Sequence, residues 1–241
     1  MVESRRPGPD DKPASLGLTD LLVPIIRRYN AEVHTPELIT ATWGAVYDNW
    51  VSDARRRGIS VPDIHVPSLE APQRELESSI PDVKGDLIPS LMIYYPPQLQ
   101  GRDGIITMGE MFPRLQTRTV KKDTPLQNAP DESGWLNVEA VGESPNADTT
   151  EEQLRRHFES QGRAGMNENQ YVVLAQFMSL TKGNFPDQRI LNRLVGSKTE
   201  GYVINSRFGS KGDLHVNSHL RPSLHGWELG GRSVKVIQKD K

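Results

Sequence analysis

The chain has 241 residues, of which 35% are hydrophobic and only 6% aromatic, and its charged residues nearly balance at a net charge of −2. Domains dedicated to nucleic acid usually carry a basic surface, so this balance argues against nucleic acid as the partner. The absence of cysteine excludes disulfides, thiol nucleophiles and cysteine metal sites, and it favours a reducing compartment.

The N-terminal stretch lacks the apolar core of a signal peptide, because residues 1–17 combine charge and proline without an apolar segment. The longest apolar runs, at residues 21–26 and 91–95, are far shorter than the ~20 residues that cross a bilayer. We therefore expect a cytoplasmic protein with no membrane partner.

Prolines divide the chain unevenly, since 15 of the 18 lie within residues 1–130. Each proline removes a backbone donor and restricts the residue before it, which disfavours long regular elements. We expect a disordered tail over residues 1–15, a helical and then proline-rich extended region over 16–130, and a compact α+β domain over 131–241. Residues 59–130 are expected to form an extended arm or irregular layer, with a strand at 105–108.

Two helices are expected near the N-terminus, over residues 19–29 and 36–57. The second has Thr35 as its N-cap, Pro36 in its first position and Gly58 to end it. Its apolar residues form one broad face, which either packs on the same chain or binds a partner. These residues are Leu38, Ile39, Trp43, Val46, Tyr47, Trp50 and Val51.

Beyond residue 131 the sequence predicts helices and strands in turn. Thr150 and Asn167 each begin a capping box, predicting helices that end before Gly162 and Gly183. Alternating polar and apolar residues predict strands at 135–139, 202–208, 213–219 and 233–237, with a glycine turn over 209–212.

No catalytic motif was found among the common phosphate-binding loops, nucleophile elbows and zinc or calcium motifs. The most suggestive pattern is the predicted strand 213–219, whose period of two places polar side chains on one face and Leu214 and Val216 on the other. That polar face is the solvated side of a surface strand, a contact for a polar ligand, or a metal site. It consists of Asp213, His215, Asn217 and His219.

The residues that follow this strand extend the candidate site. Trp227 sits beside a glycine at an element boundary, where tryptophan either anchors a loop to the core or binds a ligand. The candidate ligand-binding residues are His215, Asn217, His219, Arg221, His225 and Trp227. Farther on, Gly230 and Gly231 are expected to allow a tight entry into the last strand, and Arg232 to pair with a carboxylate or with carbonyl groups.

Several short motifs near the C-terminus belong together: residues 201–203, 212–216 and 229–234, with Phe208 between the first two. This stretch resembles the end of C-type-lectin-like domains of the formylglycine-generating-enzyme type, which include variable proteins of diversity-generating retroelements. Those domains end with a strand, a glycine turn, a strand, an irregular segment and a strand with an LGxR motif. The wider stretch 134–236 is also similar to a group of bacterial proteins without an assigned role.

The resemblance implies a C-type-lectin-like fold that presents ligand-binding loops, here over residues 217–228. Formylglycine-generating enzymes use cysteines for copper-dependent oxidation, and this chain has none, so that activity does not carry over and no catalytic residue transfers. We therefore expect a binding or interaction module for a protein or a small polar ligand, without a cofactor. The alternatives are a metal-assisted hydrolase using Asp213, His215 and His219, or an assembly protein whose proline-rich arm embraces a neighbour. The oligomeric state is left open.

Overall fold

The computed structural model of the chain describes residues 22–113, 115, 127–199, 202–217, 221 and 223–240. The tail expected over residues 1–15 and the helix start expected at Thr19 lie outside these residues. Within the described ranges, none of the helices combines the length and the apolar character that a membrane span requires.

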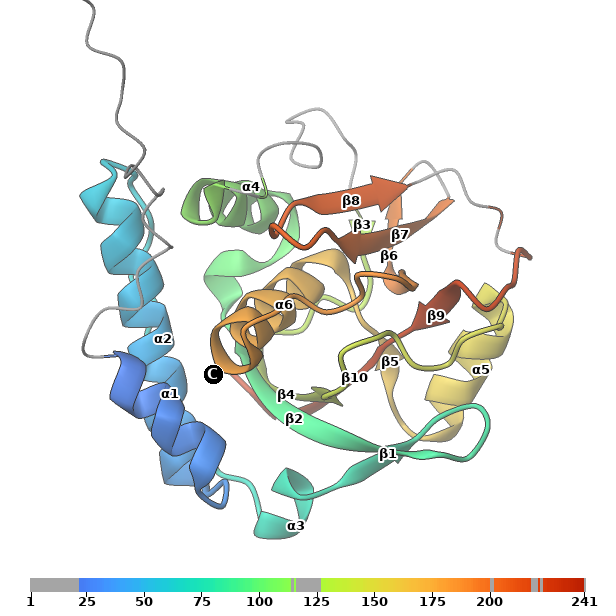
Figure 1. The fold of residues 1–241 in the computed structure, drawn as a ribbon, viewed down its shortest axis with the longest axis horizontal. Helices are drawn as coiled ribbons and strands as arrows, with labels where there is room; N and C mark the ends of the chain where they lie inside the picture. Colours follow the sequence, from blue (N-terminus) through green and yellow to red (C-terminus); the bar gives the residue numbers. More distant parts are fainter. Residues whose placement is uncertain are drawn as a thin grey trace, which may run out of the picture.

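Two sheets form the body of the protein (Figure 1). The first has five strands, all paired antiparallel, in the order β1 (Ser79–Pro81), β2 (Leu87–Tyr95), β4 (Gly134–Glu139), β10 (Ser233–Lys239) and β5 (Ala164–Gly165). The second contains β3 (Gln127–Asn128), β6 (Leu191–Thr199), β7 (Tyr202–Phe208) and β8 (Leu214–Asn217), and β9 (Leu229–Gly231) pairs parallel with β6. Helices and antiparallel sheets thus make an α+β fold, as the sequence predicts.

One helix lies between the sheets, and the others surround them (Figure 1). The central helix α6 (Glu168–Lys182) contacts β2 of the first sheet and β6 of the second, and most of its residues are buried. A helix that is covered on all sides must be largely apolar around its circumference. The remaining helices are α1 (Leu22–Ala31), α2 (Pro36–Arg56), α3 (Gln73–Leu76), the 3-10 turn η1 (Pro97–Leu99), α4 (Gly101–Met111) and α5 (Glu151–Ser160).

The apolar face of α2 packs on the same chain. The rings of Trp43 and Phe177 stack with their centroids 4.2 Å apart, which joins α2 to α6. Trp43 also donates its indole hydrogen to the carbonyl of Met92, and the Tyr47 hydroxyl donates to the carbonyl of Tyr94. These bonds satisfy the polar ends of buried aromatic rings, so this face is core and not a partner-binding surface.

Local signals at the helix ends agree with the structure. Thr35 accepts a hydrogen bond from the backbone of Leu38 at the start of α2, and the capping boxes of Thr150 and Asn167 are both complete. Gly183 ends α6 with φ +76°, a conformation that L side chains rarely adopt.

The middle of the chain differs from the extended arm that we expected. Residues 105–108, predicted as a strand, lie in α4, because residues Ile105, Met108 and Met111 recur at helical spacing and are buried together. β2 pairs with β1 on one side and β4 on the other, and its residues 92–95 are all buried. The hydrophobic core therefore runs across residue 131, where we expected the compact domain to begin.

A buried ion pair fixes the C-terminal strands, as expected for Arg232. Its guanidinium binds both carboxylate oxygens of Asp187, at 2.6 and 3.0 Å, and neither side chain is exposed. The same group donates to the backbone carbonyls of Glu139 and Val141. One arginine thus joins the turn before β10 to the end of β4 and to the segment that leads into β6.

Candidate functional site

A buried arginine holds the loop 221–229, which follows β8 in the sequence and leads into β9. Arg193 of β6 is 1% exposed, and its guanidinium donates to the carbonyl of Thr149 at 2.9 Å and to that of Leu224 at 2.6 Å. Both acceptors are backbone atoms, so these bonds position the two segments independently of the side chains at residues 149 and 224. The loop is anchored to the second sheet rather than merely lying on it.

A turn at residues 146–148 closes over the same loop. Asn146 and Asp148 both have positive φ, at 60° and 64°, which is uncommon for residues other than glycine. The Asn146 side chain donates to the carbonyl of Gly231, and the Asp148 backbone donates to the carbonyls of Gly226 and Leu229. These bonds hold the turn in its unusual conformation and fix the path of the loop.

A cleft of about 270 Å³ opens beside this loop. Trp227 lines it with an exposed fraction of 72%, whereas the other three tryptophans of the chain are buried. Leucines 191, 224 and 229 provide further apolar lining, and His225 and Glu228 provide polar groups. The cleft therefore combines a water-exposed aromatic ring with hydrogen-bonding side chains.

His225 is oriented by an acidic partner from the neighbouring turn. Its Nδ1 lies 3.0 Å from Oδ1 of Asp148, and both side chains are more than half exposed. No hydrogen bond from the described part of the chain engages the other ring nitrogen, Nε2. A carboxylate at Nδ1 fixes the ring and favours a proton on that nitrogen, which makes Nε2 an acceptor when the ring is neutral.

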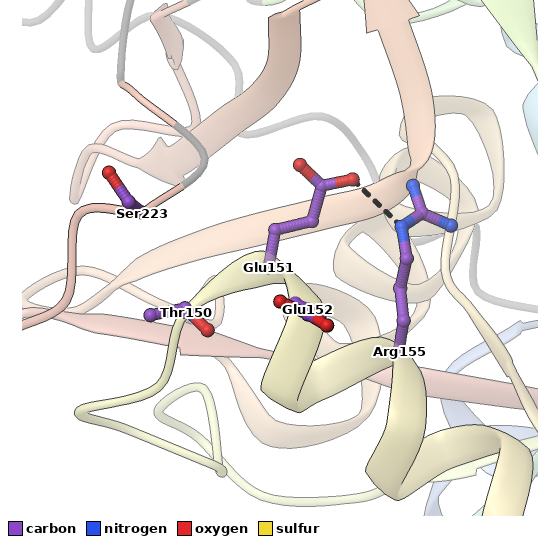
Figure 2. A pocket seen from close by; sticks show the side chains of 5 residues that line it. All are labelled: Thr150, Glu151, Glu152, Arg155 and Ser223. Carbon is purple, nitrogen blue, oxygen red and sulfur yellow. Dashed lines mark hydrogen bonds and ion pairs between the residues drawn. The ribbon is translucent and has the colours of Figure 1, made fainter.

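A second cleft lies between the start of α5 and Ser223 of the same loop (Figure 2). It measures about 330 Å³ and is lined by Thr150, Glu151, Glu152, Arg155 and Ser223. Arg155 binds Glu151 at 2.8 Å, the contact drawn in Figure 2, while Glu152 is paired with Arg156 outside the cleft. Because its lining contains no aromatic side chain, this cleft is a weaker candidate for recognition than the one at Trp227.

The structure divides the residues that the sequence singled out. His225 and Trp227 line one cleft, whereas His215 lies on β8 with its Nε2 2.6 Å from Oδ2 of Asp213 and does not line that cleft. Arg221 is exposed. Asn217 ends β8 and pairs with Asn205 through the backbone.

The faces of β8 follow the predicted alternation, since Leu214 is buried and Val216 packs against the core. His219, which the predicted metal site requires, lies outside the described residues. Within the described ranges, no three histidine, aspartate or glutamate side chains lie close enough together to hold a metal ion.

Sequence reasoning missed Asp148, Arg193 and Leu224. Leu224 and Glu228 are sequence neighbours of the selected residues His225 and Trp227, and this proximity could have indicated that they belong to the site. Asp148 and His225 are 77 positions apart, and Arg193 holds the loop through carbonyl groups. No pattern of neighbouring residues in the sequence predicts such long-range contacts.

Comparisons with models of known protein families, with curated proteins and with solved structures gave no significant match to the chain. The functional interpretation therefore depends on the geometry of the site.

Proposed function

We propose that this protein is a non-catalytic binding module that holds a small polar ligand with one flat apolar face in the cleft at Trp227. The observation that carries the proposal is the exposure of this indole on an anchored loop. Exposing so large an apolar surface to water is unfavourable, and the chain buries its other three tryptophans. Because the loop is already fixed, ligand binding loses less entropy in ordering it.

The chemistry of the cleft favours a sugar ring. The face of an indole stacks on a flat apolar surface, such as the C–H face of a pyranose. The His225 imidazole, which contacts Asp148, can accept a hydrogen bond from a hydroxyl group at the edge of the ring. The Glu228 carboxylate can accept another. A volume of about 270 Å³ is close to the lower limit of small-molecule sites and suits one ring rather than several.

A C-type-lectin-like domain is the finer fold assignment that we propose. In its support, β7, the turn at 209–212, β8, an irregular segment, β9 and Arg232 follow one another in the order typical of such domains. The Trp227 loop also falls within residues 217–228, where the resemblance implies a ligand-binding surface. Because no catalytic residue carries over, we favour binding over a hydrolase.

Tryptophan fluorescence offers a direct test, because Trp227 alone among the four tryptophans is open to a quencher in water. Acrylamide quenching of the full chain should be reduced, saturably, by at least one of glucose, galactose, mannose and N-acetylglucosamine. Trp227→Ala should remove both the accessible fluorescence and the protection.

The matched control is Val33→Ala, which shortens another exposed apolar side chain, between α1 and α2. This variant should retain the protection in full. If none of the four sugars protects the wild-type chain, the sugar assignment is wrong. If protection persists in Trp227→Ala, the ligand binds elsewhere.

A further inference from the structure

The first sheet has an open edge beside β10. β5 pairs with β10 only at Gly165 and Ala164, opposite Ser233 and Val234, although β10 continues to Lys239. Over the rest of its length, β10 has no strand on this side among the described residues. A cleft of about 450 Å³ lies at this edge, and residues 130, 132, 162–164 and 170 line it together with β10.

Arg163 lines this cleft and is only 9% exposed, yet its direct partners are all uncharged. Its guanidinium donates to the Ser233 hydroxyl at 2.5 Å and to the side-chain and backbone oxygens of Asn137 at 2.9 and 2.7 Å. The Ser233 hydroxyl in turn donates to the Glu139 carboxylate, which thus lies one hydrogen bond beyond the guanidinium. Arg232, in contrast, has Asp187 as a direct partner.

These bonds orient the guanidinium and, among the described residues, engage only part of its donor capacity. A guanidinium carries five N–H groups, and the three bonds engage three of them. Burial lowers the pKa of Arg163, because a desolvated cation is unfavourable, and the carboxylates of Glu139 and Glu75 offset only part of this effect. A buried cation of this kind at a cleft wall would be stabilised by an anionic ligand.

The remaining lining adds positive charge and apolar surface. Lys235 and Lys239 line the cleft and are 42% and 66% exposed; Lys239 contacts Glu132, which is the one acidic residue of the lining. Lys235 contacts Glu75, outside the lining, at 3.5 Å. The apolar lining comes from Pro130, Ala164, Val234 and Val236.

We propose that the cleft between the open edge of β10 and Arg163 binds a small organic anion, namely a carboxylate carried on an apolar body. The carboxylate is recognised by Arg163 and the two lysines, and the apolar body packs against the valines of β10. A simpler role for the lysines is to prevent another strand from pairing with the edge, and that role predicts no ligand at all.

The test uses naphthoate as the probe and its neutral analogue naphthamide as the comparison, with isotope-labelled full-length chain observed by NMR. Naphthoate should shift the backbone amides of Ala164 and Val236 saturably, and naphthamide should bind about tenfold more weakly. Inorganic phosphate, which has charge but no apolar body, should also bind more weakly than naphthoate.

The exposed lysines provide variants that do not threaten the fold. Lys235→Gln combined with Lys239→Gln should weaken naphthoate binding about fivefold to tenfold, since exposed charge pairs contribute only modestly to affinity. Lys84→Gln is the control, because Lys84 lies in the turn between β1 and β2, at the opposite edge of the sheet. Arg163→Gln should abolish binding if its thermal unfolding shows that it remains folded.

Several outcomes would overturn the proposal: no saturable shift at Ala164 and Val236, equal affinity for naphthamide, or unchanged affinity in the double lysine variant. Phosphate binding as tight as that of naphthoate would refute the apolar part. Because naphthoate is detected at Ala164 and Val236 and the sugars at Trp227, either proposal can fail without the other.

Discussion

A buried glutamate at the start of α6 makes a sharp prediction about stability and pH. Glu168 is 4% exposed, and its Oε1 has no hydrogen-bond partner in the described part of the chain. Burial raises the pKa of this carboxyl from its ordinary value of 4.5 to about 7, because the charged form loses its hydration. We predict that Glu168→Gln stabilises the protein at alkaline pH and has little effect under acidic conditions.

The sign and size follow from proton linkage. Between pH 4.5 and about 7 the folded protein retains a proton that the unfolded chain has released, so stability falls as the pH rises through this interval. The stability linked to this proton is fully present below pH 4.5, and above pH 7 about 3 kcal/mol of it is lost. Glutamine does not titrate, and it has nearly the shape of the protonated acid. Its advantage over glutamate should therefore be about 2.5 kcal/mol larger near pH 8 than near pH 5.

Urea unfolding followed by the fluorescence of the buried tryptophans measures this difference at the two pH values. Comparing the same pair of proteins at both values cancels any packing cost of the amide, which does not depend on pH. Glu152→Gln is the matched control, since Glu152 lies in the first turn of α5 and its side chain is 71% exposed. It should change stability by less than about 0.5 kcal/mol at either pH. An equal effect of Glu168→Gln at both pH values would show that Glu168 holds no proton in the folded protein.

Two further predictions concern the C-terminal strands. Arg232→Met should cost about 3 to 5 kcal/mol in urea unfolding because it leaves Asp187 buried without its partner, whereas Arg189→Met, at an exposed ion pair, should cost less than about 1 kcal/mol. Similar losses for the two variants would contradict the role of the buried pair. Gly230→Ala should lower the melting temperature more than Gly231→Ala, since a Cβ at Gly230 would come within 2.5 Å of a backbone carbonyl, and one at Gly231 within 2.7 Å of a leucine methyl group that can move. Equal losses would show that the backbone around Gly230 gives way.

The helices that the sequence predicts well are those whose ends carry their own chemistry. α2 starts after Thr35 because a threonine hydroxyl satisfies an orphan backbone donor there, and α6 ends at Gly183 because glycine tolerates a positive φ. The strand β7 and its glycine turn are equally local. Such elements depend on neighbours within a few residues, so one sequence suffices to find them.

The elements that were missed depend on distant partners. β2 contains Pro89, which suggested an irregular segment. In the structure Pro89 pairs with β1 alone, because the pairing with β4 begins at Ser90. A proline is tolerated there because its position has a neighbouring strand on one side only. α4 carries adjacent isoleucines that favour a strand by local preference, and packing on α2 and α6 makes it helical. β6 contains Arg193 and other buried polar residues, whose partners are far away in the chain. These polar residues interrupt the apolar pattern by which the buried face of a strand is recognised in a sequence.

The candidate site was predictable in its residue types but not in its geometry. Trp227 was selected because it sits beside a glycine at an element boundary, and both His225 and Trp227 fall within residues 217–228, where the resemblance implies ligand-binding loops. The contact between His225 and Asp148 requires the turn at 146–148 to meet the loop, and that turn depends on bonds from Asn146 to β9 and from Val83 to Asn146. His215, which the strand pattern had placed in the same candidate site, does not line this cleft.

Three buried arginines explain how a chain of modest apolar content positions both clefts. Arg193 ties the Trp227 loop to the second sheet, Arg232 ties the turn before β10 to β4 and Asp187, and Arg163 ties the open edge to Asn137 and Ser233. In each case the planar guanidinium bridges segments more than 20 positions apart in the sequence, and at least one of its acceptors is a backbone oxygen. Arg193 and Arg232 line neither cleft and stabilise the framework, whereas Arg163 lines a cleft without a direct carboxylate partner. That difference is why Arg163, and not the other two, points to a ligand.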